Sequence, residues 1–323
     1  MYPGSAITFE NGNLGVVATN PDGICGLVSS AAAVSTTFLL NKNYVVYSLK
    51  DAEALGIANT VDNHALYKTI DEFYAEAGNG TELWIYGVAR TRTLDQLVAD
   101  SELLLTASNR RLTAIIIKYH PSAADVTIAA GLRTGFPATL AAAQVIAEKF
   151  TVEKINPIIY IIEAWNFTGV AADLIGFSDA TTDRVKVIVG DTETRTGTYA
   201  SKGAAVGIAG ARHAKNQVHV NAGRVKDGSL KPLQLFIVDT PVEQYNVEAL
   251  HNKGFVSFRT HVGKSGYYFT HDLMACSVDN DYHFAPRRRT IDKAYRLANA
   301  TLINYTLDDL DIIDGGKISP FVA

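Results

Sequence analysis

Short apolar runs alternate with segments of helical periodicity between residues 44 and 260, and this alternation is the feature that most limits the fold. Thr113–Tyr119 and Ile158–Glu163 are rich in β-branched residues over their whole length, which is typical of strands that are buried on both faces. Between such runs, Asn63–Ala77 carries apolar residues at helical spacing and stops at Gly78. We therefore expect an α/β protein with a layered, mixed sheet flanked by helices.

The same patterns predict the remaining elements of this layer. Further strands are expected at Tyr44–Leu49, Glu82–Val88, Val185–Val189 and Leu235–Val238, and further helices at Asp51–Leu55, Thr93–Ser108 and Pro137–Phe150. Residues 1–43 are rich in small residues and are expected to form an N-terminal segment with the first short strands, at Leu14–Ala18 and Gly26–Val28.

The last part of the chain predicts α+β elements of a different kind. Phe255–Thr260 and Tyr267–Thr270 are expected to pair as a hairpin. Pro286–Asn304 predicts one long helix with two unlike faces. One face carries Ile291, Ala294, Ala298 and Leu302, and the other carries Arg289, Lys293 and Arg296.

Composition argues against several classes of protein. The net charge of −4 is unlike that of a dedicated nucleic-acid-binding protein, which usually has a basic excess. Two cysteines, Cys25 and Cys276, lie far apart and form neither a disulfide framework nor a zinc site. We identify no signal peptide, and the apolar runs are too short to cross a bilayer. We therefore expect a soluble, cytoplasmic chain without membrane insertion.

Known catalytic and cofactor motifs are incomplete in this sequence. Gly263-Lys264-Ser265 has the end of a phosphate loop, but Phe258 stands where that loop needs glycine. Gly203, Gly207 and Gly210 have the wrong spacing for a dinucleotide fingerprint and favour close helix packing instead. No nucleophile elbow is present. We therefore expect no enzyme activity, no cofactor and no metal.

Four segments, in this order, resemble the contractile tail sheath proteins of phages and of related bacterial injection systems. They are Asn63–Tyr74 followed by Gly78–Ile85, Gly197–Gly210 followed by Val218–Lys226, Leu250–Val256 with Gly266–Phe269, and Asp281-Tyr282 leading to Arg289–Ala298. The last, with the sequence RTIDKAYRLA, is the most characteristic. The resemblance implies a multi-domain sheath-like subunit, assembled in the bacterial cytoplasm and then part of a virion tail or injection particle.

The resemblance also implies partners and a mechanism. Such subunits polymerise as stacked six-fold rings around an inner tube and contract to drive the tube through a target envelope. The expected partners are other copies of the chain, the inner tail tube protein, and baseplate and tail terminator proteins, with no nucleic acid. The energy is stored at assembly, so the mechanism needs no nucleotide cofactor.

The resemblance further implies roles for the long helix and a division into domains. Arg289, Lys293 and Arg296 are expected to face the tube, and Ile291, Ala298 and Leu302 to pack the helix onto its own domain. Residues 44–90 and 191–323 are expected to form the tube-proximal core, and residues 90–190 an inserted outer domain. Residues 1–43 include one arm, from Met1 to about Val17, and the C-terminal arm of the family is expected to be missing after residue 323.

Two alternatives remain open from the residues alone. One is an α/β enzyme whose site is assembled from residues scattered in the sequence, which a deep pocket with perturbed titratable groups would favour. The other is a tail or baseplate protein that does not contract, which a long helix without a basic face would favour.

Overall fold

The computed structural model describes residues 20–123, 125–196, 199, 201–306, 312–313 and 317–318. The predicted arm from Met1 to about Val17, the predicted strand Leu14–Ala18 and the residues after Ile318 lie outside these ranges.

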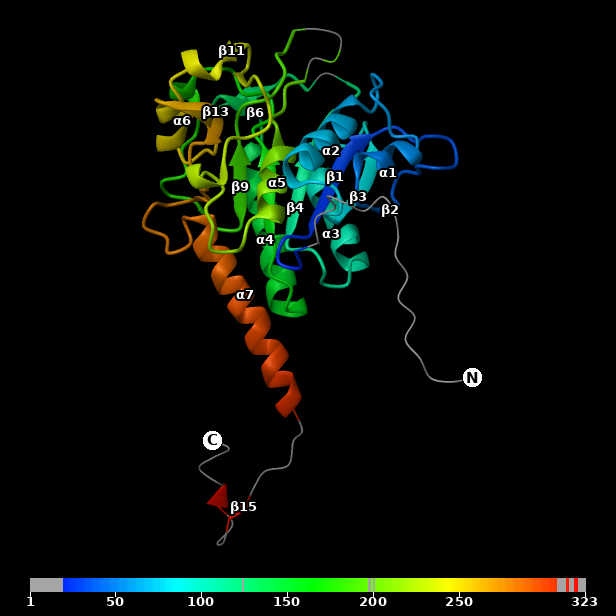
Figure 1. Ribbon diagram of the computed structural model, residues 1–323, viewed down its shortest axis with the longest axis vertical. Coiled ribbons are helices and arrows are strands. Elements are labelled where there is room, and N and C mark those ends of the chain that lie inside the picture. Colours follow the sequence, from blue (N-terminus) through cyan, green and yellow to red (C-terminus); the bar gives the residue numbers. More distant parts are fainter. Residues whose placement is uncertain are drawn as a thin grey trace.

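A six-stranded sheet forms the centre of the molecule, in the order β2-β3-β1-β4-β7-β9 (Figure 1). Five strands are parallel, and β2 runs antiparallel to β3 at one edge. This confirms the predicted mixed sheet of an α/β protein. The strands are β1 (Cys25–Ala31), β2 (Asn43–Val46), β3 (Leu83–Ala89), β4 (Ala114–Lys118), β7 (Ile159–Glu163) and β9 (Val185–Ile188).

Helices cover both faces of this sheet. Helix α2 (His64–Ala77) packs on α5 (Val206–Lys215) over one face, and α3 (Leu94–Ala107) packs on α4 (Phe136–Lys154) over the other. Neighbouring residues of a strand point to opposite faces, so β4 places Ile115 toward α3 and Ile116 toward α5. The apolar strands are therefore buried on both sides, as their composition predicts.

Glycines of α5 allow it to approach its neighbours closely. A Cβ atom at Gly210 would lie 2.2 Å from Ile116 Cδ1, and one at Gly207 would lie 2.4 Å from the Thr69 carbonyl oxygen. A larger side chain would force the backbone of α2 to shift at Gly207 and the Ile116 side chain to move at Gly210. The helix-packing interpretation of these two glycines is confirmed.

Local signals explain where several helices begin. The Thr93 hydroxyl oxygen accepts a hydrogen bond from the Gln96 backbone amide, and Gln96 Oε1 accepts one from the Thr93 backbone amide, which forms a capping box at the start of α3. Ser48 caps α1 (Leu49–Ala54) in the simpler way. Pro137 lies in the first turn of α4, where the missing amide hydrogen costs nothing.

Short elements connect and extend this core. They are the strand pairs β5 (Ile128–Ala129) with β6 (Leu132–Arg133), β8 (Thr181–Thr182) with β14 (Ala275–Cys276), β10 (Phe236–Ile237) with β11 (Thr240–Pro241), β12 (Phe258–His261) with β13 (Lys264–Phe269) and β15 (Ile312–Ile313) with β16 (Lys317–Ile318), and the helix α6 (Val247–Asn252).

Two predictions about this region have different outcomes. The hairpin is confirmed, because β12 and β13 pair around Gly263, whose φ of 75° suits a tight turn. The strand predicted at Leu235–Val238 does not join the central sheet. Val238 adopts a φ of 61° and turns the chain back, so only the two-residue β10 forms there.

Residues 90–190 share the central sheet with the residues before them. They supply β4, which lies beside β1, and then β7 and β9, which follow β4 in the sheet. The division of the chain into an inserted outer part and a tube-proximal core stays a prediction.

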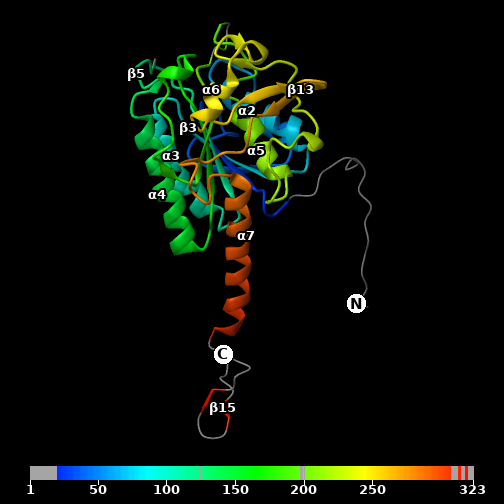
Figure 2. The same cartoon turned by 90° about the vertical axis from the view of Figure 1, so that its left-hand side faces the viewer.

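Helix α7 (Ala285–Leu302) projects from the rest of the molecule. Its N-terminal part contacts the body, where Lys293 and Arg296 bond Asp22 and Tyr295 Oη donates to the Thr151 carbonyl oxygen. Its C-terminal part extends away from the body, as both views show (Figures 1 and 2). Among the described residues, no helix combines the length and the apolar character needed to cross a lipid bilayer.

Candidate functional site

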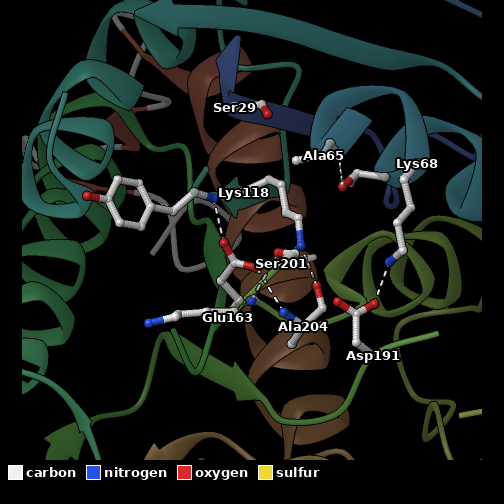
Figure 3. Close-up of polar contacts among 12 residues, drawn as sticks. Ser29, Ala65, Lys68, Lys118, Glu163, Asp191, Ser201 and Ala204 are labelled. Carbon is white, nitrogen blue, oxygen red and sulfur yellow. Dashed lines mark hydrogen bonds and ion pairs between the residues drawn. The ribbon is translucent and has the colours of Figure 1, made fainter. Parts of the chain in front are cut away.

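The carboxyl edge of the parallel sheet is the first place to look for a ligand site. The parallel strands follow the order β3-β1-β4-β7-β9, and the direction of strand addition reverses between β1 and β4. Ligands of open α/β sheets usually bind outside the carboxyl ends of the strands at such a switch point. Here the position holds a cluster of charged side chains (Figure 3).

Lys118, at the end of β4, pairs with Glu163, at the end of β7. The ammonium lies 2.9 Å from Glu163 Oε2 and 3.0 Å from the Ala204 carbonyl oxygen, to which it also donates. The two side chains are 1% and 0% exposed. Glu163 also accepts the amide hydrogens of Tyr119 and Ala204. Burial raises the pKa of the Glu163 carboxyl, and Lys118 opposes this effect.

A second buried group lies beside the first. Lys68, on α2, donates to Asp191 and lies 2.6 Å from Glu72 Oε1. Burial alone would lower the pKa of Lys68, but the two carboxylates outweigh it and hold the pKa above its usual value. Lys68 therefore stays charged, and it ties α2 to the segment that follows β9.

These two groups leave little space for a ligand. The cavity next to them, lined by Asp191, Ser201 and Gly203 among others, has a volume of ≈ 10 Å³, which is room for about one water. A Cβ atom at Gly203 would lie 2.0 Å from Glu163 Oε2. Within the described part of the chain, the switch point beside Lys118 and Glu163 is therefore filled by side chains, and its charges connect strands to neighbouring segments.

The root of α7, defined here as Ala285–Asp292, lies at the opposite, amino edge of the sheet. Arg289 is buried, and its Nη2 donates to the carbonyl oxygens of His213 (2.8 Å), Asn216 (3.1 Å) and Asp22 (3.5 Å). The first two carbonyls belong to the C-terminal end of α5, which carries the negative end of the helix dipole. Burial lowers the pKa of the Arg289 guanidinium, and nearby carboxylates oppose this effect.

Asp292 holds the other side of the root. It accepts two hydrogen bonds from Arg184, of 3.0 and 3.1 Å, and one of 3.1 Å from Arg288 Nε. The Arg288 guanidinium also lies 3.8 Å from the centre of the Tyr282 ring. Ala285 is the apolar residue of α7 that is fully buried, so the root is attached mainly through charged groups.

Asp22, three residues before β1, binds the next turn of the helix. Its carboxylate accepts from Lys293 Nζ at 2.6 Å and from Arg296 Nη2 at 3.0 Å. Both pairs are partly exposed, in contrast to Arg289 and Asp292. The positive charges of α7 that follow the root are thus already matched by a carboxylate of the same chain.

The two faces of α7 are arranged differently from the prediction. Ile291, Ala298 and Leu302, which the sequence predicts to pack on the body, are exposed, and Ile291 and Leu302 are so by 45% and 66%. The predicted tube-facing residue Arg289 is buried instead, because the root meets the C-terminal end of α5. Contact of Lys293 and Arg296 with a tube stays a prediction.

Sequence reasoning did not identify Asp22, Arg184 or the Lys118–Glu163 pair. Asp22 and Lys293 are 271 residues apart, so no local pattern joins them. A signal did exist for Lys118 and Glu163, because each is a charged residue at the end of an otherwise apolar run. Two neighbouring parallel strands that end in opposite charges predict a buried pair.

The acidic and histidine residues near His271 do not form a metal site in the described residues. No group of three or more His, Cys, Asp or Glu side chains there is arranged to hold a metal ion. Asp272 pairs instead with Lys186 of β9, and His283 Nδ1 lies 3.1 Å from the Cys276 carbonyl oxygen.

Solved structures similar to this chain come from contractile machines. A chain of the contracted sheath complex of the extracellular contractile injection system PVC has a TM-score of 0.56 at 12% identity, covering 96% of this chain and 76% of its own. A chain of the anti-feeding prophage baseplate has a TM-score of 0.54 at 11% identity, covering 95% and 77%. The sheath tail protein of Desulfitobacterium hafniense has a TM-score of 0.53 at 11% identity, covering 97% and 85%. These likenesses show a shared fold.

The family comparison is more direct. No protein of curated function matches the chain. Residues 3–272, which include the whole central sheet and end before α7, match the family model described as DUF2586, N-terminal domain. This match covers most of the sequence, and the chain therefore belongs to the DUF2586 family.

Proposed function

We propose that this chain is a structural subunit of a contractile tail or injection particle, with a sheath-type role. The observation that carries the proposal is the extent of the shared fold. It covers 95% or more of this chain in sheath and baseplate proteins of three contractile machines, so it extends past the central sheet into α7. In the proposed role, copies assemble as stacked six-fold rings around an inner tube and contract.

The filled switch point supports a structural role over the α/β enzyme. An enzyme of this strand order would use the switch point between β1 and β4 for its ligand. Lys118 and Glu163 fill that place, and both are paired and buried. A carboxylate and an ammonium in this state stabilise the fold and are not free to exchange protons with a substrate.

The proposed partners are other copies of this chain, an inner tube protein, and baseplate and terminator proteins. Assembly is proposed to occur in the bacterial cytoplasm, before the particle is complete. Lys293 and Arg296 are the proposed tube contacts. Their side chains are partly exposed and share Asp22, and such pairs, worth about 0–1 kcal/mol each, exchange partners readily.

Negative-stain electron microscopy of the full chain, alone and co-expressed with the tube protein of its particle, tests the proposal. Hollow sleeves or stacked rings are expected. Lys293→Glu combined with Arg296→Glu should reduce sleeve formation around the tube, whereas Lys226→Glu, at an exposed site elsewhere, should not. Small, uniform particles under both conditions would overturn the sheath-type role.

A non-contracting baseplate role is the second candidate, because one similar chain comes from a baseplate. The same images separate the two roles. A sheath subunit gives sleeves of variable length, whereas a baseplate subunit gives closed assemblies of one size, since its contacts form a ring that does not stack.

A further inference from the structure

The exposed side of α7 carries an apolar stripe, defined as Ile291, Tyr295, Ala298 and Leu302. These residues follow one another at spacings of four, three and four, so they lie on one face of the helix. All four are exposed. Arg288, Lys293 and Arg296 are already matched by Asp292 and Asp22. Apart from Arg287, the exposed part of α7 left for a partner is therefore mostly apolar.

An open groove lies on another part of the same chain. It is bordered by α2 and by the loop 231–234, and its volume is ≈ 600 Å³. Ala75 and Pro232 supply apolar surface, and Leu233 is 93% exposed at its margin. Asp71 adds a carboxylate that forms no ion pair within the described part of the chain. The groove therefore combines apolar surface with a carboxylate and with the exposed ammonium of Lys231, neither of which forms an ion pair within the described residues.

The stripe and the groove lie at opposite ends of the sheet. The root of α7 contacts Asp22 and Arg184, which precede β1 and β9 at the amino edge. The groove includes Thr192 and Glu193, which follow β9 beyond the carboxyl edge. The helix points away from that edge (Figure 1). A contact between the two surfaces must therefore join different copies, head to tail.

We propose that α7 of one copy docks its apolar stripe into the groove between α2 and residues 231–234 of the next copy. Leu302 and Tyr295 meet Leu233 and Pro232, and the exposed Arg287, one turn before Ile291, lies beside Asp71 of the neighbour. A basic residue at the margin of the stripe complements the unpaired carboxylate of the groove. The inference rests on the proposed self-assembly and names one contact within it.

Disulfide trapping between two single-cysteine variants tests the contact. Leu302→Cys and Leu233→Cys proteins are mixed as full chains and oxidised, and the native Cys25 and Cys276 give little background because both are buried. The mixed disulfide is expected to exceed that of a control pair by about ten-fold, because docking raises the effective concentration of the two thiols. The control pair is Leu302→Cys with Val262→Cys, which lies at an exposed hairpin tip.

Three outcomes have distinct meanings. A mixed disulfide for Leu302 with Leu233 above the control supports the contact. A disulfide formed equally by Leu302→Cys alone would mean that α7 pairs with α7, and it would overturn the proposal. If no trapping occurs while the wild-type chain forms sleeves or rings by electron microscopy, the contact is wrong and the sheath-type function stands. If neither occurs, both fail.

Discussion

The two edges of the parallel sheet hold charged residues in contrasting ways. At the carboxyl edge, Lys118 and Glu163 are fully enclosed and connect strands to the segment just before α5. At the amino edge, the charges extend from the buried Arg289 to the partly exposed Asp22 pairs, and they attach a helix that leaves the body. Ion pairs thus hold the carboxyl edge together rigidly. At the amino edge they attach α7 to the body by a contact that can open separately, called the α7 joint here and formed by Asp22, Arg184, Arg289 and Asp292. The difference arises because the strength of an ion pair depends on its solvent exposure.

The largest loss of stability is expected when the buried ion pair at the carboxyl edge is removed. Lys118→Met removes the partner of the buried Glu163, and breaking a buried ion pair in this way typically destabilises a protein by about 3–5 kcal/mol. The midpoint of urea unfolding should fall accordingly. Lys149→Met is the matched control, since Lys149 pairs with Glu102 in an exposed setting, and its effect should stay below about 1 kcal/mol. Adding Glu163→Gln to Lys118→Met should restore part of the stability, and a double variant no better than the single would contradict this account.

A smaller loss of stability is expected at Asp292, in the buried part of the α7 joint. Asp292→Asn removes the charge that two arginines share, and charge-assisted hydrogen bonds contribute about 2 kcal/mol. Hydrogen exchange should rise first in α7 and leave the central strands protected. Asp281→Asn, at a nearby exposed site, should change neither the free energy of unfolding nor the hydrogen exchange of α7. Equal loss of protection in β4 and α7 would mean that the joint is not separable.

Lowering the pH should reduce the free energy of unfolding, because His213 is buried at the amino edge. Burial, followed by the charge of Arg289, lowers its pKa well below 6.5, so the folded state keeps it neutral while the unfolded state takes up a proton. Stability is then greatest above pH 6.5 and falls as the pH decreases, by about 1 kcal/mol per pH unit for one such group. His213→Gln should flatten the profile of unfolding free energy between pH 6.5 and pH 5.

A control exists for that profile. His219 is exposed, and His219→Gln should leave the slope unchanged. His120, near the carboxyl edge, also contributes in the same direction, since burial lowers its pKa to about 4. A variant lacking both His213 and His120 that retains the full slope would show that other groups cause it.

The smallest effect on stability is expected at Asp22. Asp22→Asn weakens two partly exposed pairs, which should lower the free energy of unfolding by about 1 kcal/mol or less. The wild type and the variant should converge at about 1 M salt, where charges are screened beyond about 3 Å. The orientation of α7 should respond more strongly, and distances measured between spin labels on α7 and α4 should broaden in the variant. Unchanged distances would mean that the root alone orients the helix.

Much of the fold follows from local sequence. The predicted strand Thr113–Tyr119 contains β4 (Ala114–Lys118), and the predicted strand Ile158–Glu163 contains β7 (Ile159–Glu163). Continuous β-branched runs suit a strand covered on both faces and little else. The capping residue Thr93 likewise marked the start of α3 correctly. These predictions succeeded because each depends on residues that are near in sequence.

The candidate site could not be predicted in the same way. Helical periodicity separates the face of Ile291 from the face of Arg289, but it does not tell which face meets the body. The expected assignment placed apolar residues inside, yet α7 leaves the body after its root, and the side it buries there meets helix carbonyls and carboxylates. That choice depends on α5 and on Asp22, which lie far away in sequence.

The position of β1 has a mechanical consequence. β1 is hydrogen-bonded along its length to β3 and β4, both parallel to it, and it begins three residues after Asp22, which grips α7. A tension applied along β1 would load both ladders in shear, so many hydrogen bonds would have to break together. A push or pull on α7 would reach the strand at the middle of the sheet through the buried Arg289, which donates to the Asp22 carbonyl oxygen, as well as through the Asp22 carboxylate. The body would then move as one rigid unit when a force acts on α7.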